Sequence, residues 1–169
     1  MVNAEFASEA IKETQHFLSD KERTYLWPNP LIMCLERIEP QLALRWAIRA
    51  YRDLLPTRRI GGLEEQQSKW LSDLESLISR PDVAEYCNQV AYDEIWVSDG
   101  NPVVRGIARL YWALQNYQLG LMEPDYRLQI AHAMTMLVDN GAGELGGDMD
   151  EVAVERAILI FRELGVAAR

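Results

Sequence analysis

The chain has 169 residues, of which 49% are hydrophobic and 25% are charged, and its formal net charge is −9. This length and composition predict one globular domain, residues 1–169, that is large enough to bury a core, and they argue against a largely disordered chain. The acidic balance argues against general binding to nucleic acid or to an anionic membrane and fits a basic protein partner better.

Several features of the sequence favour a soluble protein of the cytoplasm. No apolar run approaches the ~20 residues that a membrane-spanning helix requires. The first residues carry Glu5, Glu9 and Glu13 and have neither the basic nor the long apolar region of a secretory signal. Cys34 and Cys87 fall in different segments, so no disulfide framework is indicated and a reducing compartment is expected.

Apolar residues recur at three- and four-residue steps along the whole chain, which is the period of the α-helix. No segment shows a sustained two-residue alternation, so we expect an all-α protein, a compact multi-helix bundle of about eight helices. Proline, glycine and capping residues place the predicted helices. In chain order these helices cover approximately residues 4–18, 29–38, 40–55, 63–78, 81–94, 101–122, 124–141 and 148–164.

The segment from Asn101 to Met122 is predicted to be the central, buried helix of the bundle. Asn101 suits the N-cap position and Pro102 the first helical position. Apolar residues then occupy nearly every side of the helix, as is usual for a helix covered by others. The remaining stripe holds the hydrophilic residues Arg105, Arg109 and Asn116 together with Trp112. We expect the two arginines to face a gap in the surrounding packing.

Three arginines of the third predicted helix, Arg45, Arg49 and Arg52, are spaced at i, i+4 and i+7 and therefore share one face. Guanidinium groups suit bidentate contacts with carboxylates, so this face is a candidate site for an anion or an acidic segment of a partner. The structural alternative is a solvated face that pairs with acidic helices of the same domain.

The acidic loop before the last predicted helix contains Glu144, Asp148 and Asp150 and matches GxGxxG at residues 141–146. A helix precedes these glycines where a dinucleotide site needs a strand, and the carboxylates would repel phosphate. The spacing also fails the EF-hand pattern at three positions. We therefore predict either a loop that meets a basic partner or a simple connection.

Two tryptophans stand at predicted helix ends, where an exposed ring can anchor a partner. Trp27 precedes a Pro-Asn-Pro break, and Trp96 precedes a Ser-Asp-Gly turn. The structural alternative is a ring that fixes a turn to the core. The other large aromatic residues at helical spacing are predicted to be core residues: Trp46, Trp70, Tyr111, Trp112 and Tyr117.

The sequence gives no catalytic or metal-binding signature. His16 and His132 lack a second ligand at the spacing of a metal site on one helix. Neighbouring carboxylates such as those of Glu64 and Glu65 diverge on a helix and make a poor acid–base pair. We therefore predict no enzyme activity, no cofactor and no bound metal.

The segment Leu42–Pro56, LALRWAIRAYRDLLP, resembles a helix of some bacterial all-helical immunity proteins, which neutralise toxins of polymorphic toxin systems. The segment Val103–Asn116 is similar in texture to their Ala- and Arg-rich helices. The resemblance implies an acidic cytoplasmic protein that occludes a partner without chemistry. Our first hypothesis is accordingly a non-catalytic protein–protein interaction protein, either an immunity protein or a secretion-associated adaptor. The alternatives are a helical scaffold or homo-oligomer subunit, and a small-molecule-binding bundle or enzyme without a recognisable motif.

Overall fold

The computed structural model describes residues 12, 28–36, 38–58, 64–98, 100–121, 125–138, 153, 155–157 and 159–160. Every regular element in this part of the chain is helical, which confirms the all-α prediction. Seven helices are described rather than about eight, when the π-helix that directly continues α5 is counted with it. They are α2 (Pro28–Leu35), α3 (Pro40–Leu54), the 3₁₀-helix η2 (Leu55–Arg58), α4 (Glu64–Leu77), α5 (Ala84–Gln89) with the π-helix η3 (Val90–Trp96), α6 (Pro102–Leu119) and α7 (Tyr126–Val138).

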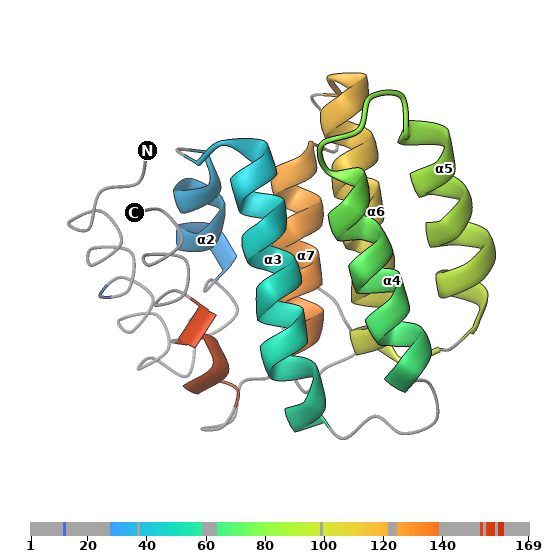
Figure 1. Cartoon of the computed structure of the whole chain (residues 1–169). Helices are drawn as coiled ribbons and strands as arrows, with labels where there is room; N and C mark the ends of the chain where they lie inside the picture. The colour runs from blue at the N-terminus through green and yellow to red at the C-terminus, as the bar shows by residue number, and fades with distance from the viewer. Residues whose placement is uncertain are drawn as a thin grey trace.

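The helices form two layers with an additional helix at one edge (Figure 1). In this view α3 and α4 lie in front, α7 and α6 lie behind them, and α5 flanks α6 at the right of the picture. Helix α6 packs against α3, α4, α5, η3 and α7, so it lies at the centre of the described helices. No described helix is both long and apolar enough to cross a membrane.

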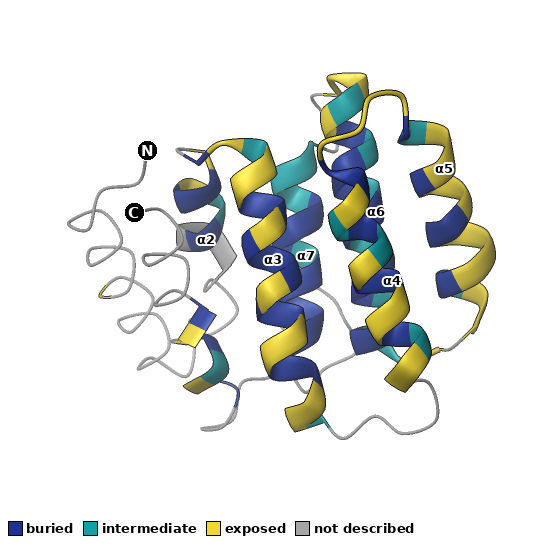
Figure 2. Ribbon diagram, in the orientation of Figure 1, coloured by how far each residue is buried: buried dark blue, intermediate teal, exposed yellow. Residues whose placement is uncertain are grey.

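Helix α6 begins with the capping signal that the sequence predicts and ends at Leu119, before the predicted end at Met122. The Asn101 side chain accepts a hydrogen bond of 2.9 Å from the Val103 backbone N–H, which is an N-cap. Gly120 ends the helix in the left-handed conformation, at φ 64°, where a side chain would be strained. Ile107 and Leu114 between these ends are fully buried, and the buried positions run along the length of the helix (Figure 2).

Helices α3, α6 and α7 meet at Tyr51, whose ring is completely buried. Its hydroxyl lies 3.0 Å from the backbone oxygen of Val103 on α6 and 3.2 Å from that of Ala133 on α7, and can donate to either. Burial raises the pKa of this phenol far above its ordinary value, so the donor proton is retained. Gly106 faces the same hydroxyl, and a Cβ atom at this position would overlap it. The close approach of the three helices therefore requires glycine on α6.

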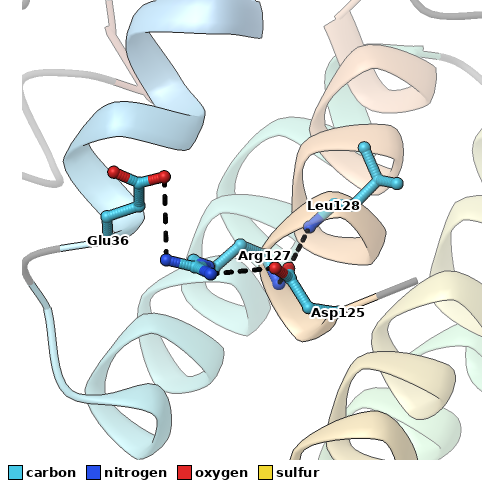
Figure 3. A network of polar contacts seen from close by, with 4 residues as sticks. All are labelled: Glu36, Asp125, Arg127 and Leu128. Atoms are coloured by element: carbon cyan, nitrogen blue, oxygen red, sulfur yellow. Dashed lines mark hydrogen bonds and ion pairs between the residues drawn. The ribbon is translucent and has the colours of Figure 1, made fainter. Parts of the chain in front are cut away.

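A polar network fixes the beginning of α7 (Figure 3). Asp125 accepts hydrogen bonds from the backbone N–H groups of Arg127 and Leu128, at 2.9 and 3.2 Å, and so serves as the N-cap. The Arg127 guanidinium pairs with the same carboxylate at 2.9 Å and lies 3.7 Å from Glu36, directly after α2. Burial acts to raise the pKa of Asp125, but these hydrogen bonds outweigh it and hold the pKa below its usual value.

The edge helix formed by α5 and η3 departs from its prediction at both ends. It begins at Ala84 rather than at Pro81, and it continues as a π-helix to Trp96 rather than ending near Glu94. The residues before it are held by Gln118 of α6, whose side chain accepts from the Val83 N–H at 2.9 Å and donates to the Arg80 oxygen at 2.7 Å. Asp82 adopts a left-handed backbone conformation, at φ 57°, which an α-helix cannot contain, so the helix begins only at residue 84.

Candidate functional site

A group of aromatic and arginine side chains joins η3 to α6. We call it the aromatic–arginine cluster, and it consists of Tyr92, Trp96, Arg105, Arg109 and Trp112. Residues 105, 109 and 112 lie at i, i+4 and i+7 on α6 and are partly exposed on an otherwise buried helix. The predicted stripe therefore exists at these three positions. Asn116, which was expected in the same stripe, is instead buried one turn further on, where the helix ends against its neighbours.

The cluster is a continuous stack of rings and cations. The Trp96 and Trp112 rings are 5.3 Å apart between centroids, and the Tyr92 and Trp112 rings are 6.5 Å apart. The guanidinium carbons of Arg105 and Arg109 lie 4.7 and 5.4 Å from the centre of the Trp96 ring, within cation–π range. Arg109 is also 5.5 Å from the centre of the Trp112 ring.

Hydrogen bonds fix this stack to three elements. Arg105 Nε donates to the backbone oxygen of Trp96 at 3.2 Å, which ties the end of η3 to α6. Trp112 Nε1 donates to Asn88 Oδ1 of α5 at 3.1 Å. Arg109 Nη1 donates to Gln129 Oε1 of α7 at 3.3 Å. The rings are therefore ordered before a partner binds, which lowers the side-chain entropy that is lost when a partner docks against them.

The charge of Arg109 is balanced by aromatic faces rather than by a carboxylate. It makes no ion pair with a carboxylate of the described chain, and its Nε has no partner there. Burial lowers the pKa of this guanidinium, although not enough to remove the charge near pH 7. His132 of α7 lies nearby. Burial, and to a smaller extent the positive charge of Arg109, lowers the pKa of the His132 imidazole. His132 is therefore neutral at pH 7.

The outer face of η3 presents apolar and acidic side chains together. We define it by four exposed residues: Tyr92, Asp93, Glu94 and Val97. Tyr92 is 58% exposed and Val97 66%, high values for residues of this kind. Residues 81–104 contain five acidic residues and neither lysine nor arginine, so no basic side chain of this stretch offsets the carboxylates. Exposed apolar groups beside the carboxylates of Asp93 and Glu94 suit a partner surface that is apolar and basic, while the nearby cations Arg105 and Arg109 lie over the Trp96 ring.

The α3 arginines share one face, as their spacing predicts, and that face lies along α4. Arg45 donates to Ser79 Oγ at 3.0 Å, and Arg52 donates to Ser72 Oγ at 3.3 Å. Arg52 also pairs with the Glu75 carboxylate at 2.6 Å. Arg49, between them, is exposed. Arg52 thus contacts α4, and Arg45 contacts the turn that follows α4, while partner binding at this face stays a prediction.

The structure separates the remaining candidate residues into two groups. Trp96 belongs to the aromatic–arginine cluster and is partly buried, and its ring packs against Trp112 of α6. Trp27, Glu144, Asp148 and Asp150 lie outside the described residues, as does the glycine-rich loop at residues 141–146. Among the residues predicted to be core, Trp46, Trp70 and Tyr111 are buried, whereas Trp112 is partly exposed and Tyr117 is 36% exposed.

A second set of polar groups, between α4, α5 and α6, is partly buried and structural in character. The Asp73 carboxylate accepts from the Tyr111 hydroxyl at 3.0 Å and from the Tyr86 hydroxyl at 3.1 Å. Burial, and to a smaller extent the negative charge of Asp73, raises the pKa of the Cys87 thiol to about 12, so this cysteine is a poor nucleophile near pH 7. Within the described residues, no group of three or more His, Cys, Asp or Glu side chains is arranged to hold a metal ion.

Sequence reasoning missed the exposed members of the site. Tyr92 lies within the π-helix, and Val97 is the C-cap residue that directly follows it. The signal available in the sequence was the absence of basic residues from 81 to 104.

Comparison of the chain with protein-family models, curated proteins and solved structures finds no match.

Proposed function

We propose that this protein is a non-catalytic protein–protein interaction protein, and that it binds an apolar, basic surface of its partner through the outer face of η3. The observation that carries the proposal is the exposure of Tyr92 and Val97 beside the carboxylates of Asp93 and Glu94. Tyrosine, tryptophan and arginine are the residue types that dominate binding energy at protein interfaces. The aromatic–arginine cluster supplies all three, with the rings already held in place.

The charge distribution supports a basic partner. The whole chain carries a formal charge of −9, and the stretch that forms the edge helix has acidic residues without basic ones. Opposite charges accelerate encounter over distances of about 8 Å at physiological salt, the length over which such attraction is screened. We therefore expect the association rate to fall as the salt concentration rises.

The class of interaction protein that we propose is an immunity protein or a secretion-associated adaptor that acts in the cytoplasm. The resemblance of residues 42–56 and 103–116 to helices of immunity proteins supports this proposal. Cys34 and Cys87 are both buried, and the free thiol of Cys87 is compatible with a reducing compartment. The acidic loop residues Glu144, Asp148 and Asp150, and the Arg45, Arg49 and Arg52 face, are proposed as secondary contact regions.

The test is capture of partners from the source cells with three forms of the chain, followed by kinetics with the purified partner. The variant Tyr92→Ala/Val97→Ser removes the exposed apolar groups of η3. The control variant Leu119→Ser changes a residue that is 54% exposed at the far end of α6. We expect one basic protein to be captured by the wild type and the control, and its affinity for the double variant to fall at least about 30-fold, since interface anchors contribute about 2 kcal/mol or more.

Three outcomes would contradict the proposal. The captured protein could retain its affinity for the double variant, in which case it binds elsewhere. Its association rate could be independent of the salt concentration, which would contradict the proposal that opposite charges accelerate the encounter. Sedimentation could show that the outer face of η3 mediates self-association that the double variant abolishes, which would favour the homo-oligomer alternative instead.

A further inference from the structure

A cavity of about 610 Å³ lies where the end of α3 and η2 meet the first turns of α4. This volume is within the range of ~300–1,000 Å³ that is common for small-molecule sites. The apolar part of its wall consists of Leu55, Pro56 and Leu71. The polar part consists of Arg52, Glu64, Gln67 and Ser68. The cavity shares no residue with the aromatic–arginine cluster or with the outer face of η3.

Gln67 is the unusual member of this wall. Its side chain is buried, with 2% exposure, yet its amide nitrogen Nε2 has no hydrogen-bond partner within the described chain. Leaving a buried donor unpaired is energetically costly, so such a group is normally satisfied. Glu64, Gln67 and Ser68 are spaced at i, i+3 and i+4 and share a face at the N-terminal end of α4, where the helix dipole is positive. This corner of the cavity therefore favours an acceptor oxygen.

The charges around the cavity do not favour an anion. The Arg52 guanidinium is already paired with Glu75 at 2.6 Å and bonded to Ser72 at 3.3 Å. The Glu64 carboxylate is exposed and lines the same cavity, so it would repel a negatively charged ligand. The acceptor that complements Gln67 is therefore a neutral oxygen, as in an amide or a ketone.

We propose that this cavity binds a small, neutral molecule that has an apolar body and a carbonyl oxygen, and that the Gln67 amide, which is buried in the cavity wall, turns so that Nε2 donates a hydrogen bond to that oxygen. Leu55, Pro56 and Leu71 then cover the apolar body. The proposal is independent of partner binding at η3, because the two regions have no residue in common. A negative result for one leaves the other unaffected.

The experiment titrates the full-length chain with N-methylbenzamide and, for comparison, with ethylbenzene, which has a similar apolar body but no carbonyl group. Binding is followed by the backbone and side-chain amide signals of the chain in ¹H–¹⁵N NMR spectra. The variant Gln67→Leu removes the donor. The control Gln66→Leu makes the same change at the adjacent position, which does not line the cavity.

We expect N-methylbenzamide to shift the Gln67 side-chain amide signals and to bind Gln67→Leu about five- to tenfold more weakly than the wild type, the loss expected for one hydrogen bond. Gln66→Leu should bind as the wild type does, and ethylbenzene should not distinguish the variants. A second variant, Ser68→Phe, places a ring at an exposed position of the wall and should abolish binding of both probes. Equal affinity of Gln67→Leu and wild type, or shifts that avoid residues 64–71, would overturn the proposal.

Discussion

Replacing Gly106 by alanine tests whether the junction of α3, α6 and α7 depends on a missing side chain. In an open helix this change stabilises a protein by about 1 kcal/mol, because alanine has the better helix propensity. Here the new Cβ would overlap the Tyr51 hydroxyl and would lie 3.3 Å from the Met136 Cβ. The ring must move, so the hydroxyl loses its bonds to the Val103 and Ala133 oxygens.

The opposing contributions give the expected magnitude. Loss of the hydroxyl's hydrogen bonding costs about 1–1.5 kcal/mol, and overpacking of a well-filled core costs about 1–3 kcal/mol. After the gain in helix propensity is subtracted, Gly106→Ala should lower the free energy of unfolding by about 1–3.5 kcal/mol. Urea unfolding followed by circular dichroism at 25 °C measures this difference.

Two further variants make the test specific. In Tyr51→Phe the hydroxyl is absent, and the nearest atom of that ring to the new Cβ is Cζ, at 3.0 Å. The cost of Gly106→Ala should therefore be at least about 1 kcal/mol smaller in the Tyr51→Phe background. Gly100→Ala is the control, since no atom lies within 4 Å of a Cβ there, and it should change stability by less than about 0.5 kcal/mol. A neutral or stabilising Gly106→Ala, or equal costs in both backgrounds, would refute the reasoning.

Three other predictions concern single residues of the fold. Ile107→Asp should prevent cooperative folding, because it places a charge at a fully buried position of the central helix, and a native-like thermal melt would show that α6 is not central. Asp125→Ala should lower the free energy of unfolding by about 1 kcal/mol at pH 7, because α7 loses its N-cap. The pKa of Asp125 is lower in the folded state than its unfolded value of 3.8, so this difference between variant and wild type should disappear as pH falls well below 3.8. Folding lowers the pKa of His132 from 6.5, so the wild type should lose stability as pH falls below 6.5. His132→Gln should lose less stability over the same range. If the free energies of unfolding of the two proteins change in parallel with pH, His132 is not the cause of the loss.

The helices that could be predicted from the sequence are those whose signals are local. Asn101 and Pro102 mark the beginning of α6 through the backbone conformations that they favour, and the structure places the beginning there. Pro40 likewise opens α3. Each of these signals acts within a few residues of its own position, so one sequence is sufficient to detect it.

The candidate site could be predicted only in part, because it depends on contacts between distant segments. The spacing of Arg105, Arg109 and Trp112 reveals a stripe on α6, but it does not reveal that Trp96 covers the stripe. A π-helix has no apolar period that distinguishes it from a short α-helix, so the exposure of Tyr92 could not be read from the pattern. Gln67 is similar, since a glutamine at a helical core position gives no indication that its amide lacks a partner.

The attachment of the edge helix to the rest of the protein has a consequence for its dynamics. Helices α5 and η3 pack chiefly on α6, and they are fastened near their two ends, by Gln118 at residues 80 and 83 and by Arg105 at residue 96. A segment that depends on one neighbour can detach while the remaining helices stay folded, so its amides should exchange with solvent before those of α6 and α7. A ligand that binds the exposed side of such a segment would slow that exchange. The amide exchange rate of the edge helix would then show whether a ligand is bound to it.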